Sequence, residues 1–415
     1  MANNKRIWII NQYAATPETG QGGRHYYFSK ILAKLGYDVY LIVASYTHFT
    51  PKAIEFNGDF KVKDIDKNLH FVWVNVASYN DAHSKQRLIN WFTFSWKLTK
   101  LDKTLPKPDV ILYSSPSLVG YLGAERVAKK LKVPLAFEVR DIWPLTLCEI
   151  GGYSKKHPFI KFLEKIEQRA YKKSDFIISN LKNSYQHMQS LGMDPKKFTW
   201  IPNGFMKDIV ENSEPLEQKT IDQLPKDKFI VGYAGTFGVA NSLDTFINAA
   251  AKLKSHTDIA FVLVGKGKLK NELIQQAQDL KLDNVYFVDA IPKIQVQTIL
   301  QKFDVCYIGL TKDPLFRFGV SPNKLFDYLY SGRPIIYAID SGEYTPVTDA
   351  RAGIQVEPQN IDQIVKAVLD LYYSTPKERD KIGQNGYEEA LKSYEFESLT
   401  NKLLSVLFGE KCLKD

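Results

Sequence analysis

Hydrophobic residues occur along this chain as short runs separated by amphipathic stretches with helical spacing. In the first half, the runs predict strands over residues 6–11, 39–43, 69–75, 109–114, 135–139 and 175–179. The stretches between most of these strands predict helices over residues 24–35, 84–101, 118–130 and 158–172. The second half predicts strands, again with helices between, over residues 229–234, 260–264, 284–288, 305–309, 334–338 and 353–356. This alternation is typical of the α/β class, in which helices cover both faces of parallel sheets.

Length and composition indicate two globular domains. A chain of 415 residues is too long for a single hydrophobic core. Its 44% hydrophobic and 24% charged residues are typical of a soluble protein. Residues 200–204, followed by an acidic stretch without periodicity up to residue 226, indicate the hinge region. We therefore expect two Rossmann-like domains, the first over residues 1–204 and the second over residues 205–390.

Cysteine usage and hydropathy point to a cytoplasmic protein. Cys148, Cys306 and Cys412 are scattered and show neither metal-ligand spacing nor a disulfide framework. The first apolar run covers only residues 7–10, which is too short for a signal peptide. No run approaches the ~20 apolar residues that span a bilayer. We expect no bound metal and no membrane-spanning segment.

Charge is divided unevenly between the two halves. Residues 1–204 hold 30 Lys+Arg and 17 Asp+Glu, a net of +13, whereas residues 205–415 have a net charge of −4. A basic half suits an anionic lipid surface, a phosphorylated acceptor or nucleic acid. Because no nucleic-acid-binding motif is present, we expect no nucleic-acid partner.

The region over residues 87–100 has cationic residues at both ends and aromatic residues between them. Trp91, Phe92, Phe94 and Trp96 could lie in a membrane interface, where aromatic and basic side chains are favoured. The alternative is a helix that packs in the core between two strands. The first reading predicts a protein that is peripheral on the inner face of the membrane.

The most informative segment covers residues 316–337. Ser321 followed by Pro322 predicts an N-cap and first helical position, and Gly332 predicts the end of that helix. Lys324 would lie beside the free N–H groups of the first turn, which form an anion site. Asp327, one turn later, could accept two hydrogen bonds from a ribose diol. The pair would suit a nucleotide diphosphate, although an ordinary capped surface helix has the same pattern.

Three glycine loops follow predicted strands, at the edge of the sheet where ligands bind in such folds. Glycine allows backbone N–H groups to approach a ligand closely. None of the loops is a G-x-G-x-x-G fingerprint, so we do not expect dinucleotide binding. Each loop alone could be an ordinary turn. The candidate ligand-binding residues in these loops are Gly22, Gly23, Gly235, Thr236, Phe237, Gly238, Gly265 and Lys266.

A charged pair, Arg140 and Asp141, closes the fifth predicted strand of the first half. Charged residues at the carboxyl end of a strand, before a bulky Trp-Pro turn, are typical of an active site. The alternative is a local surface ion pair.

Taken together, these motifs resemble the retaining GT-B glycosyltransferases known as group 1 or family 4. The resemblance covers nearly the whole chain and includes the first glycine loop and residues 201–204, 232–235, 263–267 and 321–334. Residues 139–144 and 319–327 are similar to the branch of bacterial N-acetylfucosamine-type transferases that build surface polysaccharides, such as capsule or O-antigen. Residues 394–407 resemble the last helix of the family.

The resemblance implies two Rossmann-like domains whose parallel sheets face each other across a cleft. The first would bind the acceptor, the second would bind the nucleotide sugar, and a helix within residues 391–415 would cross back to the first. The implied donor is a UDP-sugar, with an N-acetylated amino or deoxy sugar, and no cofactor is needed. The implied acceptor is lipid-linked or an oligosaccharide, and an anionic membrane surface is an expected partner.

The resemblance also implies roles for individual residues. Lys324 would stabilise the leaving diphosphate, while Asp141 and Arg140 would orient the acceptor or the sugar. Asp327 would bind the ribose. Further donor contacts would come from Ile291, Arg317, Ser321, Asn323 and Leu325.

The chain departs from the family pattern at several positions. The first of two spaced glutamates falls on Gly319 and the second on Asp327, the usual His falls on Arg140, and the usual Lys falls on Asn241. Two other functions stay open from the residues alone: a sugar-nucleotide epimerase of the same architecture, and a hinged ligand-binding protein.

Overall fold

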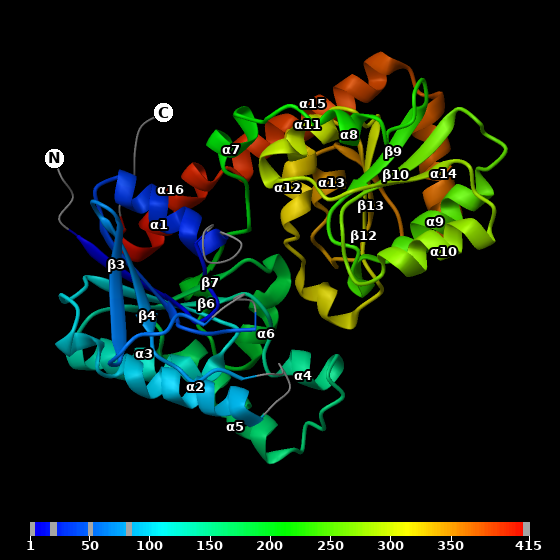
Figure 1. The fold of residues 1–415 in the computed structure, drawn as a ribbon. Helices are drawn as coiled ribbons and strands as arrows, with labels where there is room; N and C mark the ends of the chain where they lie inside the picture. The colour runs from blue at the N-terminus through cyan, green and yellow to red at the C-terminus, as the bar shows by residue number, and fades with distance from the viewer. Residues whose placement is uncertain (1–4, 17–22, 49–52, 80–84, 410–415) are drawn as a thin grey trace. The chain divides into compact units, whose positions relative to one another are not determined.

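The structure is a computed structural model that describes residues 5–16, 23–48, 53–79 and 85–409. The chain forms two compact units, which are described separately (Figure 1). The first unit contains Met1–Pro202 together with Phe396–Asp415, and the second contains Asn203–Glu395. The boundary expected after residue 204 lies two residues beyond the end of the first segment.

The first unit is built on an eight-stranded sheet with the strand order β3-β4-β2-β1-β5-β6-β7-β8. All neighbouring strands are parallel except β3 and β4, which form an antiparallel pair at one edge. The strands are β1 (Arg6–Asn11), β2 (Asp38–Ala44), β3 (Phe60–Asp66), β4 (Leu69–Val74), β5 (Val110–Ser114), β6 (Leu135–Val139), β7 (Phe176–Ser179) and β8 (Phe198–Trp200).

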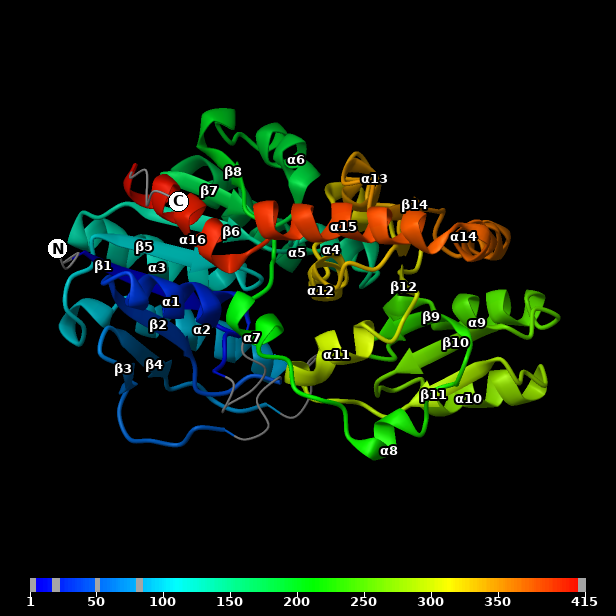
Figure 2. The same cartoon turned by 90° about the horizontal axis from the view of Figure 1, so that it is seen from above.

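Helices cover both faces of this sheet (Figures 1 and 2). They are α1 (Arg24–Lys34), α2 (Lys85–Leu98), α3 (Leu118–Leu131), α4 (Leu145–Glu149), α5 (Pro158–Lys173), α6 (Tyr185–Ser190) and α16 (Phe396–Phe408). On one face α1 packs against α16, where the rings of Phe28 and Phe396 meet edge to face at 5.2 Å. On the other face α3 packs against both α2 and α5.

The second unit has a six-stranded parallel sheet with the order β11-β10-β9-β12-β13-β14. Its strands are β9 (Phe229–Ala234), β10 (Ile259–Val264), β11 (Val285–Val288), β12 (Val305–Gly309), β13 (Ile335–Ala338) and β14 (Gly353–Gln355). Its helices are α7 (Lys207–Glu211), α8 (Gln218–Ile221), α9 (Leu243–Lys252), α10 (Lys270–Asp279), α11 (Val296–Leu300), α12 (Asn323–Tyr330), α13 (Pro346–Asp349), α14 (Ile361–Tyr373) and α15 (Pro376–Ser393). Helix α9 packs against α10 and α14, and α12 packs against α15.

Every strand predicted from the hydrophobic runs is present. Two further strands, β3 and β8, were not predicted. Strand β3 is largely exposed at the sheet edge and therefore lacks a buried apolar face, and β8 has only three residues, all half-buried. The stretch expected to be irregular after residue 204 contains the short helices α7 and α8.

The aromatic residues of α2 divide between core and surface. Trp91 is 4% exposed and Phe94 is completely buried, so the expectation that they insert into a membrane is wrong. Phe92 and Trp96 lie on the opposite side and are 46% and 58% exposed. Among the described residues, no helix combines the length and apolarity needed to cross a bilayer.

Candidate functional site

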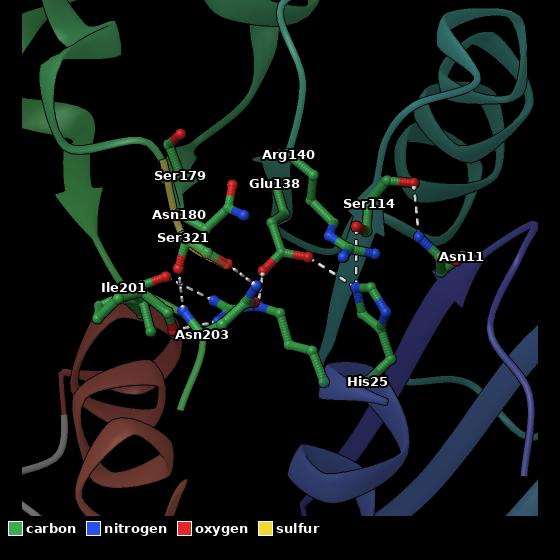
Figure 3. A network of polar contacts seen from close by, with 12 residues as sticks. Asn11, His25, Ser114, Glu138, Arg140, Ser179, Asn180, Ile201, Asn203 and Ser321 are labelled. Carbon is green, nitrogen blue, oxygen red and sulfur yellow. Dashed lines mark hydrogen bonds and ion pairs between the residues drawn. The ribbon is translucent and has the colours of Figure 1, made fainter. Parts of the chain in front are cut away.

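Helix α12 begins one residue later than expected. Pro322 occupies the N-cap with extended backbone (φ −72°, ψ 127°), and no side chain caps the helix. Ser321 is not the N-cap, because its hydroxyl accepts a hydrogen bond from the Asn203 N–H at 2.9 Å (Figure 3). The Asn203 side-chain amide also donates to the Ser321 carbonyl at 2.8 Å. Without a capping side chain, the first N–H groups of α12 stay available for a ligand.

Lys324, in the first turn of α12, is held by neutral groups only. Its Nζ donates to the Asn241 Oδ1 at 2.5 Å and to the Tyr233 hydroxyl at 3.0 Å. The ammonium also lies 4.8 Å from the centre of the Tyr233 ring. In the part of the chain that the structure describes, no carboxylate forms an ion pair with it. Burial therefore lowers the pKa of Lys324 to about 8.

Two glycine loops of the second unit pack backbone to backbone beside Lys324. A Cβ on Gly265, where φ is +151°, would lie 1.9 Å from the Gly235 carbonyl oxygen, so only glycine fits. Both the Tyr233 hydroxyl and the Asn241 Nδ2 donate to the Thr236 carbonyl, at 2.7 and 3.0 Å. The loop over residues 235–238 is thereby fixed to the groups that hold the ammonium.

Asp327 lies one turn further along α12 and is 6% exposed. Its Oδ2 accepts from the Lys293 Nζ at 2.5 Å, an ion pair that sequence reasoning missed. Lys293 follows Ile291, one of the predicted donor contacts, by two residues. A diol that binds to Asp327 would therefore share the carboxylate with the Lys293 ammonium.

The remaining residues that were predicted to bind the donor differ in how far they are buried. The side chains of Phe237 and Leu325 are completely buried in the hydrophobic interior, so neither can present its side chain to a ligand. Arg317 donates to the Pro314 carbonyl within its own turn. Gly238, Lys266, Ile291 and Asn323 are half-buried or exposed. Gly22 lies outside the described residues.

At Gly319 the departure from the family pattern has a structural reason. Its φ is +90°, in the region that residues with a side chain rarely adopt. A glutamate at this position would be strained unless the backbone changed. The glycine closes the short turn Pro314–Phe318 that precedes α12.

In the first unit, polar residues meet where β1, β5, β6 and β7 end (Figure 3). Glu138 is 1% exposed and accepts from the Arg24 Nε at 2.8 Å and from the His25 Nε2 at 2.7 Å. The same His25 nitrogen lies 2.9 Å from the Ser114 hydroxyl. Arg24 also donates to the carbonyls of Ile201 and Pro202. These contacts join the first turn of α1 to β6 and to the last residues of the segment.

In this cluster Glu138 and Arg24 are charged and form an ion pair, whereas the His25 ring is neutral. Burial by itself would raise the pKa of Glu138, but Arg24 and His25 outweigh it and hold the pKa well below its usual range. Burial lowers the pKa of His25, which is therefore neutral at pH 7. In this buried ion pair, Glu138 accepts from both Arg24 and His25, and Arg24 also donates to two backbone carbonyls.

Arg140 and Asp141 follow β6 directly and do not form the surface ion pair considered above. The Arg140 N–H donates to the Ser115 hydroxyl at 2.9 Å, and its buried Nε has no partner among the described residues. The Asp141 side chain reaches solvent. Nearby protein atoms nevertheless exclude part of the water around its carboxyl and raise its pKa, and the positive charge of Arg140 lowers that pKa by a smaller amount. Both groups could therefore contact a ligand at this sheet edge.

Sequence reasoning missed Arg24, His25, Glu138, Tyr233 and Lys293. Glu138 lies inside an apolar run that predicts a buried strand. A carboxylate is rarely buried without a partner, so its presence there indicated that a cation or a hydrogen-bond donor lies beside it. The two residues that open α1 directly follow the glycine loop, which was the other signal. Tyr233 and Lys293 had no local signal.

Both halves of the chain match families of glycosyltransferases. Residues 20–206 match the model of Glycosyltransferase Family 4, and residues 216–389 match that of Glycosyl transferases group 1. The chain is a glycosyltransferase with a family 4 domain followed by a group 1 domain. The two matches meet near the boundary between the two compact units.

Curated relatives of this glycosyltransferase are distant. A protein of Escherichia coli K12 that carries the name of a colanic acid biosynthesis glycosyl transferase, WcaI, is 23% identical over 276 residues, which are 63% of this chain and 66% of that protein. A Campylobacter jejuni enzyme is 31% identical over 115 residues, 27% of this chain and 29% of that enzyme; its name is N-acetylgalactosamine-N,N'-diacetylbacillosaminyl-diphospho-undecaprenol 4-alpha-N-acetylgalactosaminyltransferase. The chain thus spans less than two thirds of the length of each.

Solved structures show the same fold. The Anabaena protein HepE, in complex with UDP and glucose, has a TM-score of 0.65 and 14% sequence identity. The similarity covers 98% of this chain and 100% of HepE. This glycosyltransferase therefore has the GT-B fold, an α/β architecture with two parallel sheets, as expected from the motifs.

Proposed function

We propose that this glycosyltransferase transfers a sugar from a UDP-sugar, with retention of anomeric configuration, to a lipid-linked or saccharide acceptor in bacterial surface polysaccharide synthesis. The transferred sugar is an N-acetylated amino or deoxy sugar. HepE was solved with UDP and glucose, and the name of the Campylobacter relative includes a diphospho-undecaprenol-linked acceptor. WcaI is named for polysaccharide synthesis.

The observation that carries the proposal is the ammonium of Lys324. A half-buried cation surrounded by neutral oxygens is costly unless an anion binds beside it. It lies in the first turn of α12, whose N–H groups have no capping side chain. A diphosphate placed there would receive a charge-assisted hydrogen bond and the favourable end of the helix dipole.

The same positive charge would promote bond cleavage. As the bond between sugar and diphosphate breaks, negative charge grows on the leaving phosphate. Lys324 and the N–H groups at the start of α12 would stabilise that charge without moving, which is the efficient form of electrostatic catalysis. In the first unit, Asp141 and Arg140 would orient the acceptor hydroxyl or the sugar.

A panel of UDP-sugars tests the reaction. The full chain is incubated with each donor and a lipid-linked acceptor, UDP release is measured, and the anomeric configuration of the product is read by NMR. We expect UDP release from one donor that depends on the acceptor, and a retained configuration. A change in the donor sugar that needs no acceptor would indicate an epimerase, and binding without turnover of any donor would leave only a binding protein.

We also propose that the first unit docks peripherally on an anionic membrane, on its cytoplasmic face. Ile89, Phe92 and Trp96 are spaced along one face of α2 and are 60%, 46% and 58% exposed. The Phe92 ring stacks at 6.1 Å on Phe162 of the neighbouring α5, which also presents exposed lysines. Exposed apolar residues beside basic ones are typical of an interfacial surface.

Vesicle co-sedimentation tests this surface. Binding should require anionic lipid and weaken with salt, because each basic side chain near such a surface contributes about 1 kcal/mol that salt screens. The double variant Phe92→Ser, Trp96→Ser should bind less, whereas Tyr373→Ser, which removes a 71% exposed tyrosine from the second unit, should bind normally. Equal binding to neutral and anionic vesicles would contradict the proposal.

A further inference from the structure

The groups around Lys324 form a closed set of contacts. Its ammonium donates to the Asn241 Oδ1 and to the Tyr233 hydroxyl. Those two side chains in turn donate to one acceptor, the carbonyl of Thr236. Asn241 and Tyr233 thus each accept a hydrogen bond from the ammonium and donate one to the loop over residues 235–238.

This arrangement fixes the orientation of the Asn241 amide. The Thr236 carbonyl can only accept, so the amide must turn its Nδ2 toward the loop and its Oδ1 toward Lys324. The Tyr233 hydroxyl is fixed in the same way, because its single hydrogen points at Thr236 and leaves a lone pair for the ammonium. Tyr233 is completely buried, so it has little freedom to turn away.

We infer that Asn241 and Tyr233 are positioning residues for the donor diphosphate: their neutral oxygens hold the Lys324 ammonium in place without neutralising its charge. This inference rests on the proposed function of Lys324. A carboxylate at either position would hold the ammonium more tightly but would also compete with the diphosphate. A neutral acceptor leaves the full charge for the ligand.

No other titratable group considered around Lys324 neutralises its charge among the described residues. Asp327, on the same helix, is paired with Lys293. Burial raises the pKa of Tyr233 far above its ordinary value, so its hydroxyl stays neutral. Asp244, in the first turn of α9, is exposed and forms no ion pair with Lys324 among the described residues. Lys324 consequently loses its proton near pH 8, and the affinity for a diphosphate should fall as pH rises above that value.

The test compares Asn241→Asp with wild type by titrating the full chain with UDP from pH 6.5 to 9.5. The added carboxylate would form an ion pair with Lys324, so UDP should bind roughly 10- to 100-fold more weakly at pH 7. The ion pair also raises the pKa of Lys324, so the pH at which the remaining affinity falls should move upward. Tyr233→Phe should bind UDP more weakly without changing the charge of the cluster.

A matched control is Asn248→Asp, which makes the same change at a half-buried asparagine of α9 that accepts from Gln276. It should keep the wild-type affinity and pH profile. If Asn241→Asp keeps the wild-type affinity, or loses affinity with no movement of the pH profile, the positioning role is overturned. If wild type itself does not bind UDP, the proposed donor site fails instead, so the two failures are distinguishable.

Discussion

Replacing Lys324 by Met should separate function from stability. Met keeps the length and the apolar stem of the side chain but removes the charge and the donors. The variant loses the hydrogen bonds to Asn241 and Tyr233. It also removes the cation that we propose binds the leaving diphosphate.

The structure gives opposing contributions to the stability of the unliganded variant. A pKa lowered from 10.5 to about 8 means that charging Lys324 in the folded state costs up to about 3 kcal/mol, and partial solvent exposure reduces this. The cost is present below pH 8 and disappears as pH rises toward 10.5, because only the unfolded chain is then protonated. Removing Lys324 relieves this cost, but the variant also loses two hydrogen bonds that each stabilise the folded state by about 1 kcal/mol. The variant should therefore be as stable as wild type or slightly more stable.

Catalysis should change in the other direction. Lost preorganised donors cost roughly 3 kcal/mol of transition-state stabilisation, so turnover should fall at least ~100-fold. Calorimetry of the full chain with and without UDP reports stability and UDP binding, and UDP release from the donor reports turnover. UDP at about 100 times its Kd stabilises wild type by about 2.7 kcal/mol, and the variant should show a far smaller shift. A variant that keeps the UDP-induced shift and its turnover would refute the phosphate site, and a much lower unliganded Tm would mean that Lys324 is mainly structural.

Three further outcomes are expected. UDP affinity of wild type should fall as pH rises through about 8, since the ammonium is then lost; a flat titration curve between pH 7 and 9.5 would exclude Lys324 as the phosphate ligand. Asp327→Asn should weaken UDP binding in calorimetric titration, because the amide keeps one acceptor oxygen but loses the ion pair with Lys293; unchanged affinity would place ribose recognition elsewhere. Activity should persist in EDTA, since Lys324 and the start of α12 supply the positive charge that the diphosphate needs; loss in EDTA with recovery in Mn²⁺ or Mg²⁺ would show that a metal ion is required.

The sequence by itself determined the buried strands with continuous apolar runs, the class of fold and the helix that carries Lys324 and Asp327. Buried parallel strands need continuous apolar runs, so each such run could be recognised without knowledge of its neighbours. The strand β3 escaped because an exposed edge strand needs no apolar run. Lys324 and Asp327 were found because they lie on one helix, and helical spacing is a local property.

Only the tertiary structure decided which groups those residues meet. Asn241 and Tyr233 are 83 and 91 residues from Lys324 along the chain, and Lys293 is 34 residues from Asp327. No local pattern encodes a hydrogen bond over such a separation. Ser321 shows the same limit, because its hydroxyl had a favourable local role as a cap, but Asn203, 118 residues earlier, competes for it. Charge and spacing pointed to Lys324, whereas packing determined that its ammonium is held by neutral oxygens.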